Sequence, residues 1–189
     1  MSADVAPGVD GVPVLVGDRL ILRAPRSSDV EDRLALGRDP EIVRMYGGDP
    51  DSPALTREQA ESWVARLMDH RCAWVIDHEG RAVGGLRLDD IDTHDRRASL
   101  AIGIQDPVLL GQGLGPEAMR LAIGYAFGPL GLHRLGLRVL EYNTRAIRAY
   151  RKCGFVIEGR EREAAEVGGQ RYDDVIMGLL ANEWPGSSR

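Results

Sequence analysis

Three glycines at alternate positions constrain the fold of this chain more than any other feature, and they are Gly111, Gly113 and Gly115. Because glycine has no Cβ atom, such a loop can turn tightly and leave its amide N–H groups open to a ligand. The residues after the loop repeat apolar side chains at i, i+3, i+4 and i+7, namely Ala118, Leu121, Ala122 and Tyr125. This spacing predicts a helix with one buried face that begins as the loop ends.

A buried strand is predicted before the loop, because residues 98–104 are mostly apolar. A strand, a glycine loop and a helix in this order gather free N–H groups and the positive end of the helix dipole at one place. That place suits a phosphate or pyrophosphate, although a plain glycine-rich turn has the same sequence. Pro116 and Glu117 stand where a P-loop needs Lys and then Ser or Thr, and Pro116 also breaks the dinucleotide-binding pattern.

The composition is that of one folded domain. The chain has 189 residues, 43% of them hydrophobic, which is enough to bury one core. We expect a single domain over residues 18–184, a flexible N-terminal arm over residues 1–17 and a short tail over residues 185–189. The net charge is −5 and no dense basic stripe occurs, so nucleic acid is not an expected partner. A cationic or amine partner fits this charge better.

The two cysteines, Cys72 and Cys153, lie far apart and outside any C-x-x-C or Cys/His spacing. The sequence therefore predicts no disulfide framework and no metal site. Free thiols suit a reducing cytoplasm. The first residues lack the charged and apolar regions of a signal peptide, and no apolar run reaches membrane-spanning length. We therefore expect a cytoplasmic protein without membrane contact.

Periodicity predicts alternating helices and strands along the rest of the chain. Capping-box signatures at Ser28 and Thr56 predict two helices, and the segment between them, residues 40–53, is expected to be an irregular substrate loop. Residues 89–97 read as a solvated turn. Strands are expected at residues 19–23, 73–76, 82–88, 134–140, 155–158 and 171–180, and a further helix at residues 141–155. Strand, helix and strand over residues 98–140 form a crossover unit with parallel strands, so we expect an α/β layer arrangement.

Two segments together resemble the GNAT superfamily of acetyl-CoA-dependent N-acyltransferases. Residues 110–115 resemble its Q/R-x-x-G-x-G/A acyl-coenzyme A loop, and residues 143–155 are similar to the following element, N-x-x-A-x-x-x-Y-x-K-x-G-F. His133, Arg134 and the ending at residues 171–175 look like the RimJ/RimL branch. The resemblance implies an α/β (α+β) fold: a mixed, mostly antiparallel twisted sheet whose central parallel strand pair splays around the acyl-CoA site, with helices on both faces.

The resemblance also implies acetyl-CoA as co-substrate. The pyrophosphate would sit on the amides of the glycine loop, and the pantetheine arm would pair with the strand near Ile102 and Ile104, as an added strand does. The basic end of the last helix would approach the 3′-phosphate, although a solvated helix face has the same sequence. The implied cofactor-binding residues are Ile102, Ile104, Leu110, Gly111, Gln112, Gly113, Leu114, Gly115, Asn143, Ala146, Arg151 and Lys152.

Tyr150 is the residue that the resemblance implies as general acid, because a phenol can give a proton to the departing thiolate. A core tyrosine on a buried helix face is the alternative. Asn143 would hydrogen-bond the cofactor or a water, or simply cap its helix. Leu110 stands where the family has Gln, Arg or Trp, so a side-chain contact is lost there. Ser99 stands where many relatives carry a glutamate base, which leaves the base open.

The acceptor is expected to be an amine, from a protein N-terminus to a polyamine or another small molecule. Without a carboxylate at Ser99, an acceptor that is already partly neutral, such as an α-amine, is favoured. Candidate acceptor-site residues are Glu41, Tyr46, Trp74 and Ser99. A homodimer is compatible with the sequence. Two other functions are compatible as well: a catalytically weak acyl-CoA-binding or sensing module, and a nucleotide-binding switch.

Overall fold

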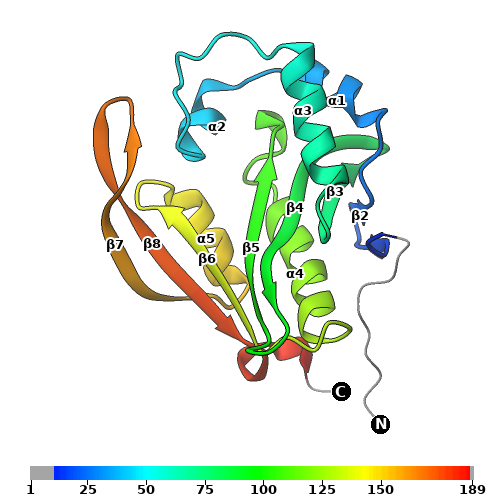
Figure 1. Ribbon diagram of the computed structural model, residues 1–189, viewed down its shortest axis with the longest axis vertical. Coiled ribbons are helices and arrows are strands. Elements are labelled where there is room, and N and C mark those ends of the chain that lie inside the picture. Colours follow the sequence, from blue (N-terminus) through cyan, green and yellow to red (C-terminus); the bar gives the residue numbers. More distant parts are fainter. Residues whose placement is uncertain (1–10, 188–189) are drawn as a thin grey trace.

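The computed structural model describes residues 11–187 of the chain. Within them, eight strands form one sheet in the order β1-β2-β3-β4-β5-β6-β8-β7 (Figure 1). Neighbouring strands are antiparallel except β5 and β6, which are parallel. The strands are β1 Leu15–Val16, β2 Ile21–Arg23, β3 Ala73–His78, β4 Arg81–Asp92, β5 Arg97–Ile104, β6 Arg134–Leu140, β7 Val156–Val167 and β8 Gln170–Leu180. The mixed sheet with its central parallel pair confirms the expected fold class.

Helices cover both faces of the sheet, as expected. Side chains alternate across β3, so Trp74 and Ile76 enter the core against α4, whereas Val75 packs with Leu67 of α3 on the opposite face. The helices are α1 Asp29–Leu36, α2 Pro40–Met45, α3 Arg57–Met68, α4 Leu114–Phe127 and α5 Thr144–Lys152, with short 3₁₀ turns at η1 Pro107–Leu109, η2 Ala181–Glu183 and η3 Pro185–Ser187.

The two central strands separate after a short parallel contact. β5 pairs with β6 from Arg97 opposite Arg134 to Ser99 opposite Gly136. β6 continues instead along β8, where the pairing reaches Leu140 opposite Asp174. The remaining part of β5 stays with β4, so the sheet opens between β5 and β6 (Figure 1).

Local capping signals were only partly correct. The capping box at Thr56 and Gln59 is present at the start of α3. Ser28 precedes α1, but its side chain makes no capping hydrogen bond. Instead, the carboxylate of Asp29 accepts the backbone N–H of Arg26 at 2.7 Å and ties the first turn of α1 to the residues before it. The α1 prediction was therefore right in position and wrong in mechanism.

The N-terminal boundary needs a correction. Residues 1–10 of the expected arm lie outside the described residues, but Leu15 and Val16 form β1 and pair with β2. The indole N–H of Trp74 also donates to the carbonyl of Pro13 at 2.8 Å. At the other end, η3 lies within the expected tail of residues 185–189, of which the last two are not described. The sheet therefore begins before residue 18.

Two segments that we expected to be loops contain regular secondary structure. Residues 40–45 form α2, because the Asp39 carboxylate caps the N–H of Ile42 at 2.9 Å and Pro40 suits the first turn. β4 extends through Asp92 with a register shift between Asp89 and Asp92, so only residues 93–96 remain for the turn. Asp89 therefore belongs to a strand and has a fixed side-chain direction.

A buried ion network joins three elements at the side of the sheet. The guanidinium of Arg23 on β2 donates to Asp29 of α1 at 2.7 and 3.0 Å and to Asp77 of β3 at 2.7 Å. All three residues are buried. The hydrogen bonds that Arg23 donates to Asp29, more than the one that it donates to Asp77, hold the pKa of Arg23 above its usual value despite burial. The network therefore ties α1 to strands β2 and β3.

Candidate active site

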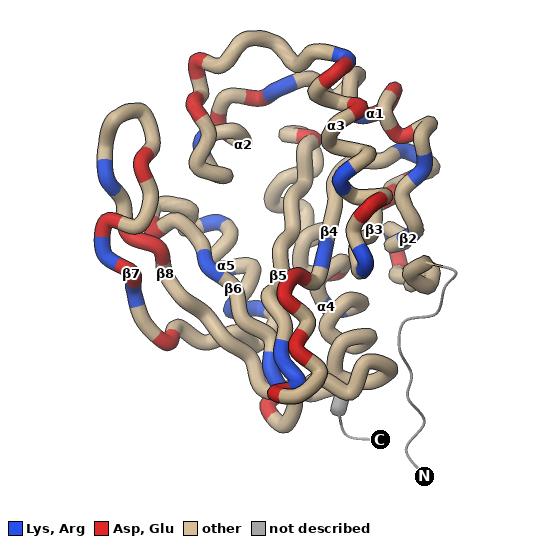
Figure 2. The backbone as a smooth tube through the Cα atoms, viewed as in Figure 1, with Lys and Arg blue, Asp and Glu red and all other residues tan. Residues whose placement is uncertain are grey.

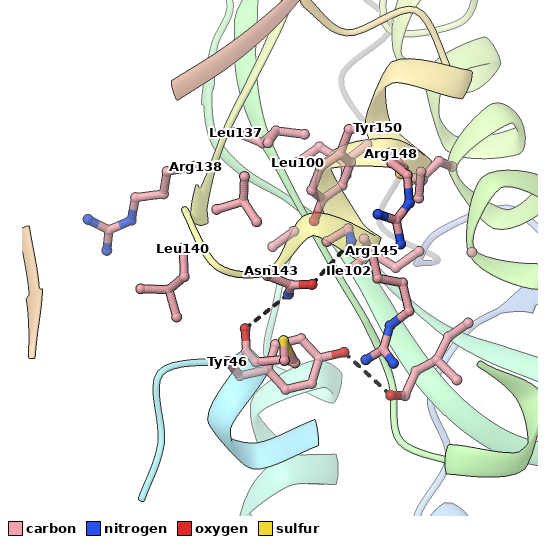
Figure 3. A pocket seen from close by; sticks show the side chains of 18 of the residues that line it. Tyr46, Leu100, Ile102, Leu137, Arg138, Leu140, Asn143, Arg145, Arg148 and Tyr150 are labelled. Atoms are coloured by element: carbon pink, nitrogen blue, oxygen red, sulfur yellow. Dashed lines mark hydrogen bonds between the residues drawn. The ribbon is translucent and has the colours of Figure 1, made fainter. Parts of the chain in front are cut away.

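A cleft of about 1040 Å³ lies where β5 and β6 separate. Its walls come from β4, β5, the glycine loop, the start of α4, β6, α5 and β8, and α2 closes one end (Figure 3). α4 and α5 pack together on one face of the sheet. An opening between two strands, with helices behind it, can admit a long ligand from one face and a second ligand from the other.

The glycine loop has the open backbone that its sequence predicts. Gly111 and Gly113 have φ angles of 77° and 89°, a left-handed region that favours glycine, and α4 begins directly after Gly113. Leu110, Gly111, Gly113 and Gly115 line the cleft.

The side chains of the other two loop residues point away from the cleft. Gln112 folds back to donate to the carbonyl of Val108 at 2.7 Å. Leu114 is buried in the core. Any contact that these two residues make with a ligand in the cleft is therefore confined to their backbone.

Arg19 braces the loop from the far end of the chain. Its guanidinium donates to the carbonyl of Gln112 at 2.8 Å and to the Glu117 carboxylate at 2.9 Å. Its backbone N–H donates to the same carboxylate at 2.8 Å. Local sequence patterns missed this contact, because it joins residues more than ninety positions apart.

Replacement of Gly113 by valine is expected to weaken acetyl-CoA binding at least tenfold, about 1.4 kcal/mol. A β-branched residue is strained at a φ of 89°, and its Cβ would lie 3.2 Å from the Arg19 guanidinium. Calorimetry of acetyl-CoA binding checks this. Gly124→Ala on the exposed side of α4 is the matched control, since a Cβ there meets nothing within 4 Å. Equal affinity of a folded Gly113→Val protein and the parent would remove the loop from the cofactor site.

The free side of β5 presents backbone groups to the cleft. The N–H of Gln105 donates to Val83 of β4, so odd-numbered residues at this end direct their N–H and C=O groups to β4. Even-numbered residues, including Ile102 and Ile104, direct theirs toward the opening that β6 has left. Both residues line the cleft. The geometry agrees with their expected role as partners of an extended ligand.

Tyr150 of α5 lines the cleft and is also packed against the core. It is buried, and its ring meets that of Phe155 edge-on at 6.0 Å. Burial, and to a smaller extent Tyr46 and Cys153, raises the pKa of Tyr150 well above its usual value. The phenol is therefore protonated throughout the physiological range. The sequence left open whether Tyr150 is a core residue or a site residue. In the structure it both packs in the core and lines the cleft.

Asn143 performs the capping role. Its Oδ1 accepts the N–H of Ala146 at 3.1 Å, and its Nδ2 donates to the carbonyl of Met45 at 3.1 Å (Figure 3). The Tyr142 hydroxyl donates to the carbonyl of Arg44 at 2.6 Å. These bonds hold α2 over the end of the cleft. Asn143 and Ala146 both line the cleft.

Basic side chains on α5 reach the cleft. Arg145, Arg148 and Lys152 line it, whereas Arg151 is exposed outside the lining. Figure 2 shows basic positions along α5 and acidic positions on β4, across the separation of β5 and β6. The cleft therefore has a basic wall and an opposite wall that carries carboxylates.

Two of the four candidate acceptor residues line the cleft and two do not. Tyr46 and Ser99 line the cleft, and the Tyr46 hydroxyl donates to the carbonyl of Ile104 at 3.4 Å (Figure 3). Glu41 is exposed outside the lining and pairs with Arg145 at 3.2 Å. Trp74 was a wrong prediction. Its indole is fully buried and meets the Tyr125 ring edge-on at 5.5 Å, because its position on β3 faces α4.

Polar residues that no local motif indicated lie on the face of the cleft opposite α4. Asp89 lies directly across from Ser99 in the register of β4 and β5, and Arg87 lies across from Ala101. The period of two along a strand places Arg87 and Asp89 on one face. Pairing the predicted hairpin with the next strand could have found them. The cleft residues on this face that the sequence did not single out are Arg87, Asp89, Asp90 and Arg138, whereas Asp174, together with Glu141, was already a candidate for the open base position.

The described residues hold neither a group of metal ligands nor a membrane-length helix. No three or more His, Cys, Asp or Glu side chains among residues 11–187 are grouped so that they could hold a metal ion. No helix in the same part of the chain is long and apolar enough to cross a membrane. Cys72 and Cys153 are both free thiols in the interior.

Comparison with known proteins identifies the family. Residues 19–156 match the family model described as the acetyltransferase (GNAT) domain. This chain belongs to the GNAT acetyltransferase family. The match covers the glycine loop, the β5–β6 opening and α5, so the GNAT domain contains most of the cleft.

Relatives of known name within the GNAT family include two spermidine N(1)-acetyltransferases. That of Vibrio cholerae is 35% identical over 160 residues, which cover 85% of this chain and 91% of the relative. That of Escherichia coli K12 is 33% identical over 111 residues, or 59% of each chain. The alignment therefore spans less than two thirds of the length of the E. coli relative.

Solved structures agree with the GNAT fold. Spermidine N-acetyltransferase from Vibrio cholerae in complex with CoA and spermine is similar with a TM-score of 0.72 and 25% identity, over 87% of this chain and 97% of that one. A GNAT acetyltransferase from Bacillus anthracis has a TM-score of 0.76 at 19% identity, over 90% and 100% of the two chains, which supports the fold alone.

Proposed function

We propose that this protein is an N-acetyltransferase that transfers an acetyl group directly from acetyl-CoA to a primary amine in the β5–β6 cleft. The observation that carries the proposal is the meeting of three features in one cleft: a glycine loop at the start of α4, the free edge of β5 and the phenol of Tyr150. Each feature matches a separate part of the reaction, and the family supports the class of chemistry.

The cofactor is proposed to lie along the basic side of the cleft. The amides of Gly111, Gly113 and Gly115 suit its pyrophosphate, because Gly111 and Gly113 are left-handed and Gly115 lies in the first turn of α4, at the positive end of that helix. The extended pantetheine arm suits the free side of β5 at Ile102 and Ile104. Arg148 and Lys152 suit the 3′-phosphate, since both line the same wall. The volume of about 1040 Å³ is large enough for a ligand of this size and a second, smaller molecule.

The reaction then needs few groups. The amine nitrogen attacks the thioester carbonyl, the C–N bond forms and the C–S bond breaks, so the sulfur leaves as a thiolate that needs a proton. Tyr150 is proposed to supply it. Asn143, already used in capping α5 and holding α2, is proposed to keep the cleft in shape rather than to exchange protons.

A small cationic amine is the acceptor that we propose first. Three carboxylates, those of Asp89, Asp90 and Asp174, and two guanidinium groups, those of Arg87 and Arg138, line the cleft away from the α5 wall, so this part of the cleft keeps an excess of negative charge that attracts a positive group. The spermidine N(1)-acetyltransferases among the relatives point to the same class of acceptor. Membership of the RimJ/RimL branch, with a protein N-terminus as acceptor, stays a prediction from the sequence.

An acceptor panel tests the proposal. The purified protein is incubated with acetyl-CoA and spermidine, a peptide with a free N-terminus, or an N-terminally blocked peptide with one lysine. Free thiol and acetylated product mass are measured. We expect thiol release with spermidine, matched by an equal amount of acetylated product. Tight acetyl-CoA binding without product from any amine would favour the sensing module instead, and stronger competition by nucleotides than by CoA would favour the nucleotide switch.

A further inference from the structure

The acceptor face of the cleft holds one carboxylate next to the position of Ser99. Asp89 on β4 is the direct cross-strand partner of Ser99 on β5, and both residues line the cleft. We propose that Asp89 is the residue that accepts the proton from the acceptor's ammonium group. This inference rests on the proposed function and adds a proton acceptor that no local sequence motif reveals.

The sheet places Asp89 on the face from which an amine must arrive. Leu88 and Leu100, a cross-strand pair, are buried in the core shared with α4. The next pair, Asp89 and Ser99, therefore faces the other way, with Cβ atoms about 5 Å apart. α4 and α5 close the first face, and Tyr150 approaches from there. An amine that reaches the cleft from the open face passes Asp89 before it meets a thioester held between the strands.

Two neighbours fix the direction of the Asp89 carboxylate. The Nε of Arg87 donates to its two oxygens at 2.8 and 2.9 Å. The Nε2 of His70 lies 2.9 Å from Oδ1. The backbone N–H of Cys72 donates to Nδ1 of the same imidazole at 3.1 Å, which assigns the remaining proton to Nε2. His70 thus donates from Nε2 to Asp89 and acts as a positioning residue.

A count of lone pairs leaves room for a substrate proton on Asp89. A carboxylate has about four acceptor positions, two on each oxygen. His70 and Arg87 both contact Oδ1, whereas only Arg87 contacts Oδ2. One position on Oδ2 remains, and the side chain is 26% exposed, so a ligand in the cleft can reach it. His70 and Arg87 therefore orient the Asp89 carboxylate and leave one acceptor position free for a ligand.

Asp174 is less well placed for the same task. It lies on β8, opposite Leu140, whereas Gly136 is the β6 residue beside Ser99. Four residues along a strand span about 13 Å. Asp174 is also buried and lies 3.7 Å from the Arg138 guanidinium. Glu141 lies outside the cleft lining and accepts the N–H of Asp173 at 3.1 Å. We therefore assign the proton to Asp89 rather than to these carboxylates.

The proposed step balances with the transfer reaction. The ammonium group gives one proton to Asp89 and becomes a neutral amine, which attacks the thioester carbonyl. Tyr150 protonates the sulfur as the C–S bond breaks, and the second proton lost from nitrogen returns to the phenolate. Asp89 then releases its proton to solvent. The products are the amide, free coenzyme A thiol and one proton, with no oxidant or reductant needed.

Asp89→Asn tests the assignment, because it keeps the shape of the side chain and removes the base. At about pH 7 we expect kcat/KM for spermidine to fall about 10²-fold, with acetyl-CoA affinity unchanged. The loss should shrink as pH rises, by about tenfold for each pH unit below the amine pKa of about 10.4, because the neutral amine then forms in solution. A purely structural role of Asp89 would not give this slope. The charged or titratable groups that contact Asp89 are His70 and Arg87, and Asp90, Arg138 and Asp174 line the same cleft.

Three comparisons complete the experiment. Asp95→Asn removes a carboxylate from the adjacent exposed turn, outside the cleft lining, and should keep the parent rate. His70→Gln retains a side-chain donor and should stay within about threefold of the parent, whereas His70→Ala should lose about tenfold. Equal pH–rate profiles of parent and Asp89→Asn would overturn the assignment and leave the proposed function standing. A parent protein that acetylates no amine would overturn the proposed function and, with it, this assignment.

Discussion

The Tyr150→Phe protein is expected to turn over about 10²-fold or more slowly than the parent, with acetyl-CoA affinity nearly unchanged. Phenylalanine keeps the ring that packs edge-on against Phe155 and removes only the hydroxyl proton. The loss should therefore appear in kcat. Steady-state rates with calorimetric binding of acetyl-CoA separate the two quantities.

Burial defines the pH behaviour of this acid. It raises the pKa of Tyr150, so no alkaline loss of activity should come from Tyr150 in the physiological range. Burial also raises the pKa of the neighbouring Cys153 thiol to about 11, which shows how strongly this region disfavours a thiolate. A coenzyme A thiolate formed nearby would gain basicity for the same reason and could take a proton from a weakly acidic phenol.

Tyr125→Phe is the matched control for Tyr150→Phe. Tyr125 is a half-buried tyrosine of α4 that contacts Trp74 and does not line the cleft. Its loss of a hydroxyl should leave kcat unchanged. If Tyr150→Phe turns over at the parent rate across the pH range, Tyr150 is a packing residue and water protonates the thiolate.

Loss of the Arg23 guanidinium should have the largest effect on stability. Arg23→Met keeps an apolar stem of similar length and leaves the carboxylates of Asp29 and Asp77 buried without their cation. Removal of one partner from such a network costs about 3–5 kcal/mol. Urea denaturation, with the free energy of unfolding compared at equal m-values, measures this cost.

An exposed ion pair supplies the control for Arg23→Met. Arg57 pairs with Glu31 at 2.8 Å on the surface, where both side chains are more than half exposed. Arg57→Met should therefore shift the unfolding midpoint little. If Arg23→Met costs no more than Arg57→Met, the buried network does not hold α1 to the sheet.

The parts of the fold that depend on local pattern could be predicted from the sequence. The glycine loop, the helix after it and the Asn143 cap each follow from residues within a few positions of one another. The parallel pairing of β5 and β6 follows from the crossover unit that connects them. Most of the residues that the family resemblance implied for cofactor binding belong to these segments and line the cleft, and their role in binding stays a prediction.

The parts that depend on distant contacts could not be predicted in this way. Trp74 was taken for an acceptor residue because the sequence does not show that its side of β3 meets α4. The brace from Arg19 to Glu117 and the tie from Asn143 to Met45 each join residues 98 positions apart. The position of Asp89 at the cleft follows only from the strand register, which places Asp89 opposite Ser99.

The order of substrate binding and acetyl transfer shows whether the β5–β6 cleft holds both reactants at once, as we propose. Initial rates are measured over a grid of acetyl-CoA and spermidine concentrations, together with the intact mass of the protein after acetyl-CoA alone. We expect intersecting double-reciprocal lines and an unchanged protein mass, as direct transfer in a ternary complex requires. Parallel lines together with an acetylated protein that passes its acetyl group to spermidine would contradict it.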